Sequence, residues 1–167
     1  MFSKTAHFGI ALGILNIVFF LLQYQQNIHT DSKNIFAIVM LPITAIMIIL
    51  SIVIASKKST GELFSIRKGL QTGIGVILIG GIMFWIYQII HANFIEPSYI
   101  GNLAEVAQKD LKLDSQFKPE EVAEKVAFFK ENYKFSLFID IVLKSLFTGF
   151  FVSLITSLVI NAFYKPQ

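Results

Sequence analysis

The chain has 167 residues, of which 54% are hydrophobic and 15% are charged, and it carries a net charge of +3 and no cysteine. Soluble domains carry about a quarter charged residues, and a domain this small leaves much of its side-chain surface in solvent. With a mean hydropathy of +0.66, the composition excludes a soluble globular enzyme and a disordered chain. Without cysteine there is no disulfide, thiol nucleophile or thiolate metal site.

Four apolar runs are long enough to cross a bilayer, whose hydrocarbon core of about 30 Å needs about 20 helical residues. They cover residues 6–23, 35–55, 70–90 and 137–163. The first run ends without the small residues of a signal-peptide cleavage site, so we expect it to be retained. The sequence therefore predicts an all-α fold, a four-helix bundle in the membrane, with residues 1–167 forming a single domain.

The charges of the connections predict how the bundle is oriented. The connection after the first run carries only Lys33, whereas the connection after the second carries four basic residues, Lys57, Lys58, Arg67 and Lys68. Because short basic loops stay in the cytoplasm, we expect both chain termini inside the cell and residues 93–135 outside it. The predicted location is the inner (cytoplasmic) membrane, with multi-pass topology.

Labelling from outside the cell tests this orientation. A cysteine that replaces Lys112 is expected to react with a membrane-impermeant thiol reagent, because it lies in the outer insertion. A cysteine that replaces Lys58 is expected to stay unlabelled until the membrane is opened. The opposite labelling pattern would invert the predicted topology.

The insertion of residues 93–135 has a helical pattern of its own. Its first half repeats apolar residues at helical spacing, at Leu103, Val106, Ala107 and Leu111. Pro119 followed by Glu120 and Glu121 suits the first turn of a second helix, because proline loses no hydrogen bond there and acids favour the positive end of the dipole. We expect an extracytoplasmic helical hairpin between the third and fourth spans.

Small and polar residues form stripes along the predicted spans. In lipid, helices associate where small residues let backbones approach and where polar groups pair. The predicted helix-packing residues are Gly9, Gly13 and Asn16 on the first span, Gly69, Gly73 and Gly80 on the third, and Gly149, Ser153 and Thr156 on the fourth. Such stripes indicate how a bundle assembles and say little about its activity.

Two interpretations are open for the charged residues near the fourth span. Asp140 and Lys144 are spaced as an intrahelical ion pair, and both lie near the predicted outer boundary, where long side chains reach the headgroups. Alternatively, they converge with Gln88 and His91 of the third span into a polar pocket that opens to the outside. Charged residues within spans are often functional, so the second interpretation deserves a test.

Other site chemistry is not indicated by the sequence. The three histidines, His7, His29 and His91, are far apart along the chain, and His7 is predicted on the side of the membrane opposite to the other two. We therefore expect neither a metal site nor a cofactor. Phosphate-binding and nucleophile motifs are absent from the sequence, and no basic stripe indicates nucleic-acid binding.

The arrangement resembles the DUF4199 family, small membrane proteins of unknown function common in Bacteroidota. The resemblance rests on a basic turn after the second span, Ser56-Lys57-Lys58, and on the segment from Gly61 to Leu70 that leads into a glycine-bearing third span. It also rests on Asn93-Phe94-Ile95-Glu96-Pro97 at the exit of that span and on an acidic insertion before a last span rich in Gly, Ser and Thr. The resemblance implies a four-span inner-membrane protein and no catalytic residue.

Two classes of function remain after these exclusions. The first is a non-catalytic component, or an assembly or stabilising factor, of a larger membrane complex, with another inner-membrane protein or a second copy of the chain as partner and lipid around it. The second is a small oligomeric transporter or channel that uses Asp140, Lys144 and His91. An enzyme is not expected, because the sequence lacks a visible set of converging reactive groups.

Overall fold

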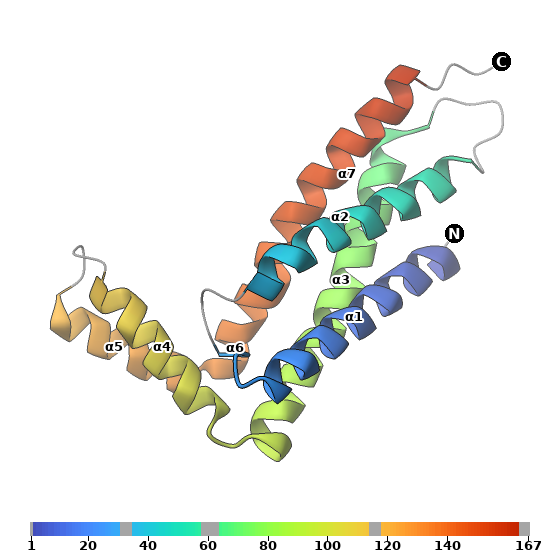
Figure 1. Ribbon diagram of the computed structural model, residues 1–167. Coiled ribbons are helices and arrows are strands. Elements are labelled where there is room, and N and C mark those ends of the chain that lie inside the picture. The colour runs from blue at the N-terminus through green and yellow to red at the C-terminus, as the bar shows by residue number, and fades with distance from the viewer. Residues whose placement is uncertain (1, 31–34, 58–63, 114–117, 164–167) are drawn as a thin grey trace.

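A computed structural model describes residues 2–30, 35–57, 64–113 and 118–163, and within these residues the chain is helical, with no strand. In chain order the elements are α1 (Phe2–Gln25), α2 (Ile35–Ser56), α3 (Ile66–Ile90), the π-helical turn η1 (His91–Ile95), α4 (Tyr99–Leu113), α5 (Pro119–Glu131), α6 (Tyr133–Phe138), the π-helical turn η2 (Ile139–Leu143) and α7 (Lys144–Phe163). Figure 1 shows four long rods and, at one end of them, the hairpin of α4 and α5.

Four helical segments are long and apolar enough to cross a membrane, which agrees with the number of predicted spans. They are Thr5–Gln25, Ile38–Ser56, Ile66–Ile95 and Tyr133–Phe163. The last two are longer than predicted, because helical hydrogen bonding continues through polar flanking residues that end an apolar run. Lys33, Lys58 and Lys165, which belong to the connections and the C-terminal end, lie outside the described residues, so the predicted orientation stays a prediction.

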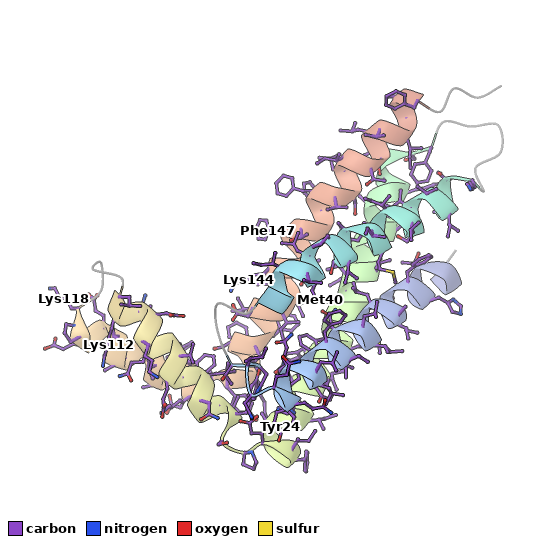
Figure 2. The ribbon with its side chains drawn as sticks, in the orientation of Figure 1. Tyr24, Met40, Lys112, Lys118, Lys144 and Phe147 are labelled. Carbon is purple, nitrogen blue, oxygen red and sulfur yellow. The ribbon has the colours of Figure 1, made fainter. Side chains whose placement is uncertain are left out.

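The spans expose much of their apolar surface. Between 17% and 33% of the most apolar part of each span is buried inside the protein. Large apolar side chains such as Ile38, Phe147 and Ile155 are exposed instead. Figure 2 shows Phe147 on the side of α7 that faces away from the other spans. A surface of this kind is unfavourable in water, and it is favourable where lipid is the solvent.

The third span, α3, is the centre of the bundle, and it contacts α1, α2 and α7. Its glycines permit this close packing. A Cβ atom added at Gly80 would lie 3.1 Å from the backbone oxygen of Gly9, and one added at Gly73 would lie 2.9 Å from a methyl carbon of Ile48 and from Cβ of Ser153. The buried core around them consists of Leu12, Ile48, Ile52, Phe64, Val76 and Ile77.

The other predicted packing residues also lie at helix contacts. Gly9 and Gly13 of α1 face Ile79 and Met83 of α3, Gly69 of α3 faces Ser157 of α7, and Gly149 of α7 faces Ile77 of α3. The polar members of the stripes bond within their own helices. Asn16 donates to the carbonyl of Leu12, Ser153 to that of Gly149, and Thr156 to that of Val152. Their hydroxyl and amide groups are thus satisfied where they pack.

The predicted insertion forms the hairpin of α4 and α5. Helix α5 begins at Pro119, with Glu120 and Glu121 in its first turn, and the carboxylate of Glu121 accepts a hydrogen bond from the backbone N–H of Lys118. The two helices bury Ala104 and Val122, which have 0% and 1% of their surfaces exposed. The hairpin lies at the end of the bundle where α1 and α3 finish, and the start of α1 and the finish of α7 lie at the opposite end (Figure 1).

Candidate functional site

A compact cluster of ionisable residues lies at the hairpin end of the bundle. It consists of His29, from the segment after α1, His91, the first residue of η1, and Glu96, which follows η1. We call these three residues the junction cluster. His91 is completely buried, and the side chains of His29 and Glu96 are 6% and 14% exposed. The cluster therefore joins two segments that are far apart along the chain, in a place that is nearly closed to solvent.

A tight helix end brings His29 into the cluster. After α1, the backbone N–H of Ile28 bonds to the carbonyl of Gln23, and the N–H of Asn27 bonds to that of Tyr24. Asn27 adopts a left-handed conformation, with φ of 56°. These are the two bonds of a Schellman motif, which reverses the chain at a helix end, and asparagine is one of the few residues that tolerate the left-handed position. The reversal directs His29 back toward the bundle.

The π-helical turn η1 positions the other two members. The backbone N–H of Glu96 bonds to the carbonyl of His91 at 2.9 Å, five residues earlier. Pro97 cannot continue this hydrogen bonding, and it disfavours a helical conformation for the residue before it, so the helix ends at Glu96. The Glu96 side chain can then turn back to His91. Turns of this kind are rare and are often found at functional sites.

One carboxylate binds both imidazoles. Nε2 of His29 lies 2.6 Å from Oε2 of Glu96, and Nε2 of His91 lies 3.2 Å from the same oxygen. The second carboxylate oxygen, Oε1, accepts a hydrogen bond of 3.0 Å from Nδ2 of Asn102 in α4. The Nδ1 atoms of both histidines are buried without a described partner. Glu96 therefore connects the end of α1, the end of α3 and the start of α4.

Aromatic rings enclose the junction cluster. The rings of Phe20 and Tyr24 of α1 meet the His91 ring edge to face, with centroids 4.9 and 4.8 Å apart. The Tyr99 ring of α4 stacks on His29 at 5.6 Å and meets His91 edge to face at 5.2 Å. Such contacts add to the free energy gained by burying the rings. They also exclude water, which strengthens the electrostatic interactions of Glu96.

The surroundings shift the pKa of two groups at the base of the hairpin. Burial alone would raise the pKa of Glu96, but the hydrogen bonds from His91, His29 and Asn102 outweigh it and lower the pKa below its usual range. The carboxylate is therefore held in its charged form. Burial raises the pKa of the Tyr99 hydroxyl, so this hydroxyl stays neutral.

Two further contacts tie the hairpin to the bundle. Nδ2 of Asn93 donates to the Tyr133 hydroxyl at 3.0 Å, which joins η1 to α6 where the hairpin returns. The indole N–H of Trp85 in α3 donates to the backbone carbonyl of Lys134 at 2.9 Å. These two contacts hold the returning end of the hairpin against the third span, and the bond from Asn102 to Glu96 holds its start.

The four residues of the predicted polar pocket do not come together. Gln88 and His91 are buried at the hairpin end of α3. Asp140 and Lys144 are exposed, and they form an ion pair with each other at 2.5 Å. Figure 2 shows Lys144 on the side of the fourth span that faces away from the other helices. The two pairs are separated because Asp140 and Lys144 lie on the side of the fourth span opposite to Gly149 and Ser153, which pack against the bundle.

The length of the fourth span agrees with the alternative interpretation, an interfacial ion pair. Tyr133–Phe163 has 31 residues, and this makes it about 46 Å long, roughly 16 Å more than the hydrocarbon core. The first turns of the span can therefore lie among the headgroups. Asp140 and Lys144 sit in this part, where charges are tolerated.

The prediction of no metal site rested on the distance of the histidines along the chain, but the structure brings His29 and His91 together. Their ring centroids are 5.9 Å apart, although 61 residues separate them in the sequence. Distance along the chain does not show this proximity, although the predicted topology already placed both residues on the same side of the membrane. The available signals were Asn27 after the first span and Pro97 after the third, each of which marks a place where the chain reverses.

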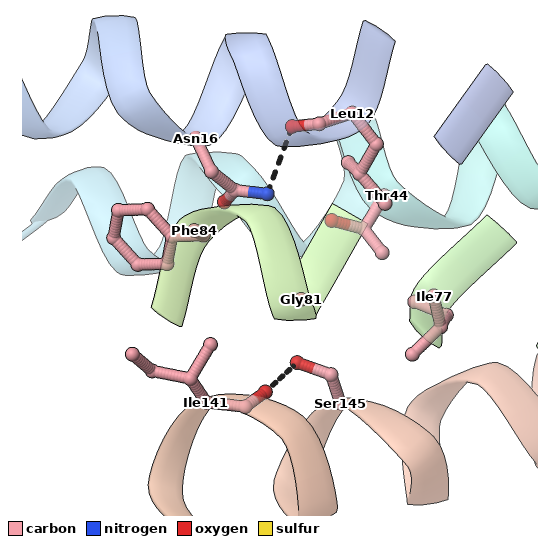
Figure 3. A pocket seen from close by; sticks show the side chains of 8 residues that line it. All are labelled: Leu12, Asn16, Thr44, Ile77, Gly81, Phe84, Ile141 and Ser145. Atoms are coloured by element: carbon pink, nitrogen blue, oxygen red, sulfur yellow. Dashed lines mark hydrogen bonds between the residues drawn. The ribbon is translucent and has the colours of Figure 1, made fainter. Parts of the chain in front are cut away.

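A second feature is a pocket between the spans, shown in Figure 3, with a volume of about 150 Å³. Its lining comes from all four spans and consists of Leu12, Asn16, Thr44, Ile77, Gly81, Phe84, Ile141 and Ser145. The hydroxyl of Ser145 donates to the carbonyl of Ile141 beside the widened turn η2. The side chains of Asn16, Thr44 and Ser145 can form hydrogen bonds, and none of the lining residues is ionisable.

Comparison with known proteins identifies a family and no activity. Residues 7–162 match the family described as "Protein of unknown function (DUF4199)". The match covers nearly the whole chain and confirms the resemblance seen in the sequence. No curated protein matches the chain, and no solved structure matches it.

Proposed function

We propose that this chain, which belongs to the DUF4199 family of proteins of unknown function, is a non-catalytic component of a larger complex in the inner membrane. In this proposal the hairpin of α4 and α5 contacts another membrane protein. The observation that carries it is the attachment of the hairpin to the spans through the buried ring of Tyr99 and through the hydrogen bonds of Glu96 and Asn93. A projection fixed at both ends presents one surface in one orientation, which lowers the entropy cost of binding a partner.

The surface of the hairpin supports this proposal. Its outer side carries charged residues of both signs, including Glu124 and Lys130, and two large apolar side chains. These are Leu113 and Phe128, which are 81% and 56% exposed. A polar surface with a few exposed apolar anchors is typical of a protein interface.

The alternative, a transporter or channel, needs Asp140, Lys144 and His91 to share a path. The described structure places the first two on the exposed side of the fourth span and His91 inside the junction cluster. The pocket between the spans offers hydrogen-bonding groups and no ionisable residue. The geometry therefore favours the component over the transporter.

Photo-crosslinking in intact membranes tests the proposed contact. A benzoylphenylalanine at position 128 is expected to form a crosslink to a different membrane protein, identified by mass spectrometry. Tyr99→Ala is expected to reduce this crosslink at least about fivefold, because losing a buried aromatic ring costs about 3 kcal/mol or more and frees the base of the hairpin.

The matched control is Phe94→Ala, which removes an aromatic ring that is 81% exposed at the same end of the bundle. It is expected to leave the crosslink unchanged. Size-exclusion chromatography in detergent checks that both variants remain folded. Crosslinks only between copies of this chain, or none at all, would contradict the proposed partner.

A further inference from the structure

We propose that His29, His91 and Glu96 bind one divalent first-row transition-metal ion, with Zn²⁺ as the reference ion. The inference concerns the junction cluster alone and does not depend on the proposed partner. The three side chains offer two imidazole nitrogens and a carboxylate oxygen that lie within 4.8 Å of one another. They come from two segments of the chain, the end of α1 and the turn η1, and one ion would connect the two.

The distances suit an ion of this size. Zn²⁺ binds histidine nitrogen and carboxylate oxygen at about 2.0–2.2 Å, so neighbouring ligand atoms in a tetrahedral site lie roughly 3.4 Å apart. The separation between Nε2 of His91 and Oε2 of Glu96 is 3.2 Å, and that between Nε2 of His29 and the same oxygen is 2.6 Å. The distance between His29 and Glu96 would need to increase by less than about 1 Å, and the two imidazole nitrogens, which lie within 4.8 Å of each other, would need to reach the same spacing.

The protonation of the histidines permits coordination. A neutral imidazole carries one proton, and it binds a metal through the other nitrogen. Both Nδ1 atoms are buried without a described hydrogen-bond partner. Without an ion, each Nε2 atom donates its proton to the charged Glu96 carboxylate. An ion that binds at Nε2 would displace these protons, and each neutral imidazole would then carry its single proton at Nδ1, where no described group occupies the lone pair.

The groups around the cluster fit the surroundings of a metal site. Metal ligands are usually oriented by further hydrogen bonds, and here Nδ2 of Asn102 holds the second carboxylate oxygen of Glu96. The rings of Phe20, Tyr24 and Tyr99 enclose both imidazoles. This shell limits the rotation of the ligands and keeps water away. Folding has therefore already fixed the ligand side chains, and an ion that binds them does not have to order them.

The ligand set selects the class of ion. Two imidazoles and one carboxylate favour Zn²⁺ and its first-row neighbours, whereas Mg²⁺ and Ca²⁺ prefer sites made of oxygen alone. The chain has no cysteine, so the site offers no thiolate for a softer ion such as Cu⁺. Three protein ligands leave the fourth position of a tetrahedral ion to water or to an external ligand.

Direct titration of the purified chain tests the site. The full chain, carrying an affinity tag without histidine, is purified in detergent, treated with chelator and titrated with Zn²⁺ by calorimetry. We expect one Zn²⁺ per chain, with no competition from excess Mg²⁺. His29→Gln and Glu96→Gln are each expected to weaken binding at least about 100-fold, since changes to second-shell residues alone cost about 10–100-fold.

His7→Gln is the matched control, because His7 lies in the first turns of α1, at the opposite end of that helix from the cluster. It is expected to leave the affinity unchanged. Co²⁺ provides a second measurement on the unaltered chain, since coordination by these ligands gives intense visible absorption bands that excess Zn²⁺ removes. No saturable Zn²⁺ binding, or equal affinity in the unaltered chain and in both folded cluster variants, would overturn the proposal.

Discussion

Replacing Glu96 by alanine is expected to lower the free energy of unfolding by about 3 kcal/mol, measured by chemical denaturation in detergent with chelator present. The substitution removes the acceptor that both imidazoles share, and it leaves His91 buried and His29 almost buried without that partner. It also removes the acceptor for Asn102 at the start of α4. Protease should then cleave the chain between α3 and α4 faster than in the unaltered protein.

Glu124→Ala is the matched control for this prediction. Glu124 is an exposed carboxylate on α5, and its removal is expected to change the free energy of unfolding by less than about 0.5 kcal/mol. If Glu96→Ala and Glu124→Ala had the same small effect, the hydrogen bonds of Glu96 would not hold the hairpin in place.

Gly73→Leu is expected to have the second large effect, a loss of about 3 kcal/mol or failure to accumulate in the membrane. Gly73 lies where α3 meets α2 and α7, and even a single added carbon would lie 2.9 Å from a methyl carbon of Ile48 and from Cβ of Ser153, and it would overlap the Ser153 hydroxyl. A leucine there would force the three helices apart. The thermal stability of the purified protein and its amount in membranes measure the effect.

Gly101→Leu is the control for Gly73→Leu. Gly101 lies in α4, and an added Cβ would meet nothing within 4 Å. Leucine has a higher helix propensity than glycine, so this variant is expected to be as stable as the unaltered protein or slightly more stable. Equal losses in both variants would show that the close contact at Gly73 does not matter.

Much of the fold follows from local patterns in the sequence. Long uncharged runs predict spans because a bilayer accepts only helices with all backbone groups bonded. Pro119 with its two following acids predicts the start of α5, and the structure places it there. The resemblance to the DUF4199 family is likewise carried by short local signatures, and the family match confirms it.

The junction cluster depends on geometry that such patterns do not contain. His29 reaches Glu96 across 67 residues because Asn27 reverses the chain and because η1 adds one residue to a helical turn. Periodicity at 100° per residue assumes a regular helix, and a π-helical turn changes the direction of every residue after it. A helical wheel therefore could not predict the positions of His91 and Glu96 relative to α1.

The sequence predicts part of the separation of Asp140 and Lys144 from Gln88 and His91. A helical wheel places the charged pair opposite the small residues of the fourth span, which predicts an exposed ion pair, as the structure has it. What the wheel could not give was the burial of His91, which depends on Phe20, Tyr24 and Tyr99 from two other helices.

The direct contact between His29 and Glu96 fixes the hairpin to the bundle. A double-mutant cycle of His29→Ala and Glu96→Ala in chelator tests it, with the cycle of His7→Ala and Glu96→Ala as control. A direct hydrogen bond predicts a coupling of about 1 kcal/mol or more in the first cycle and additive losses in the second. Additive losses in both cycles would contradict the account.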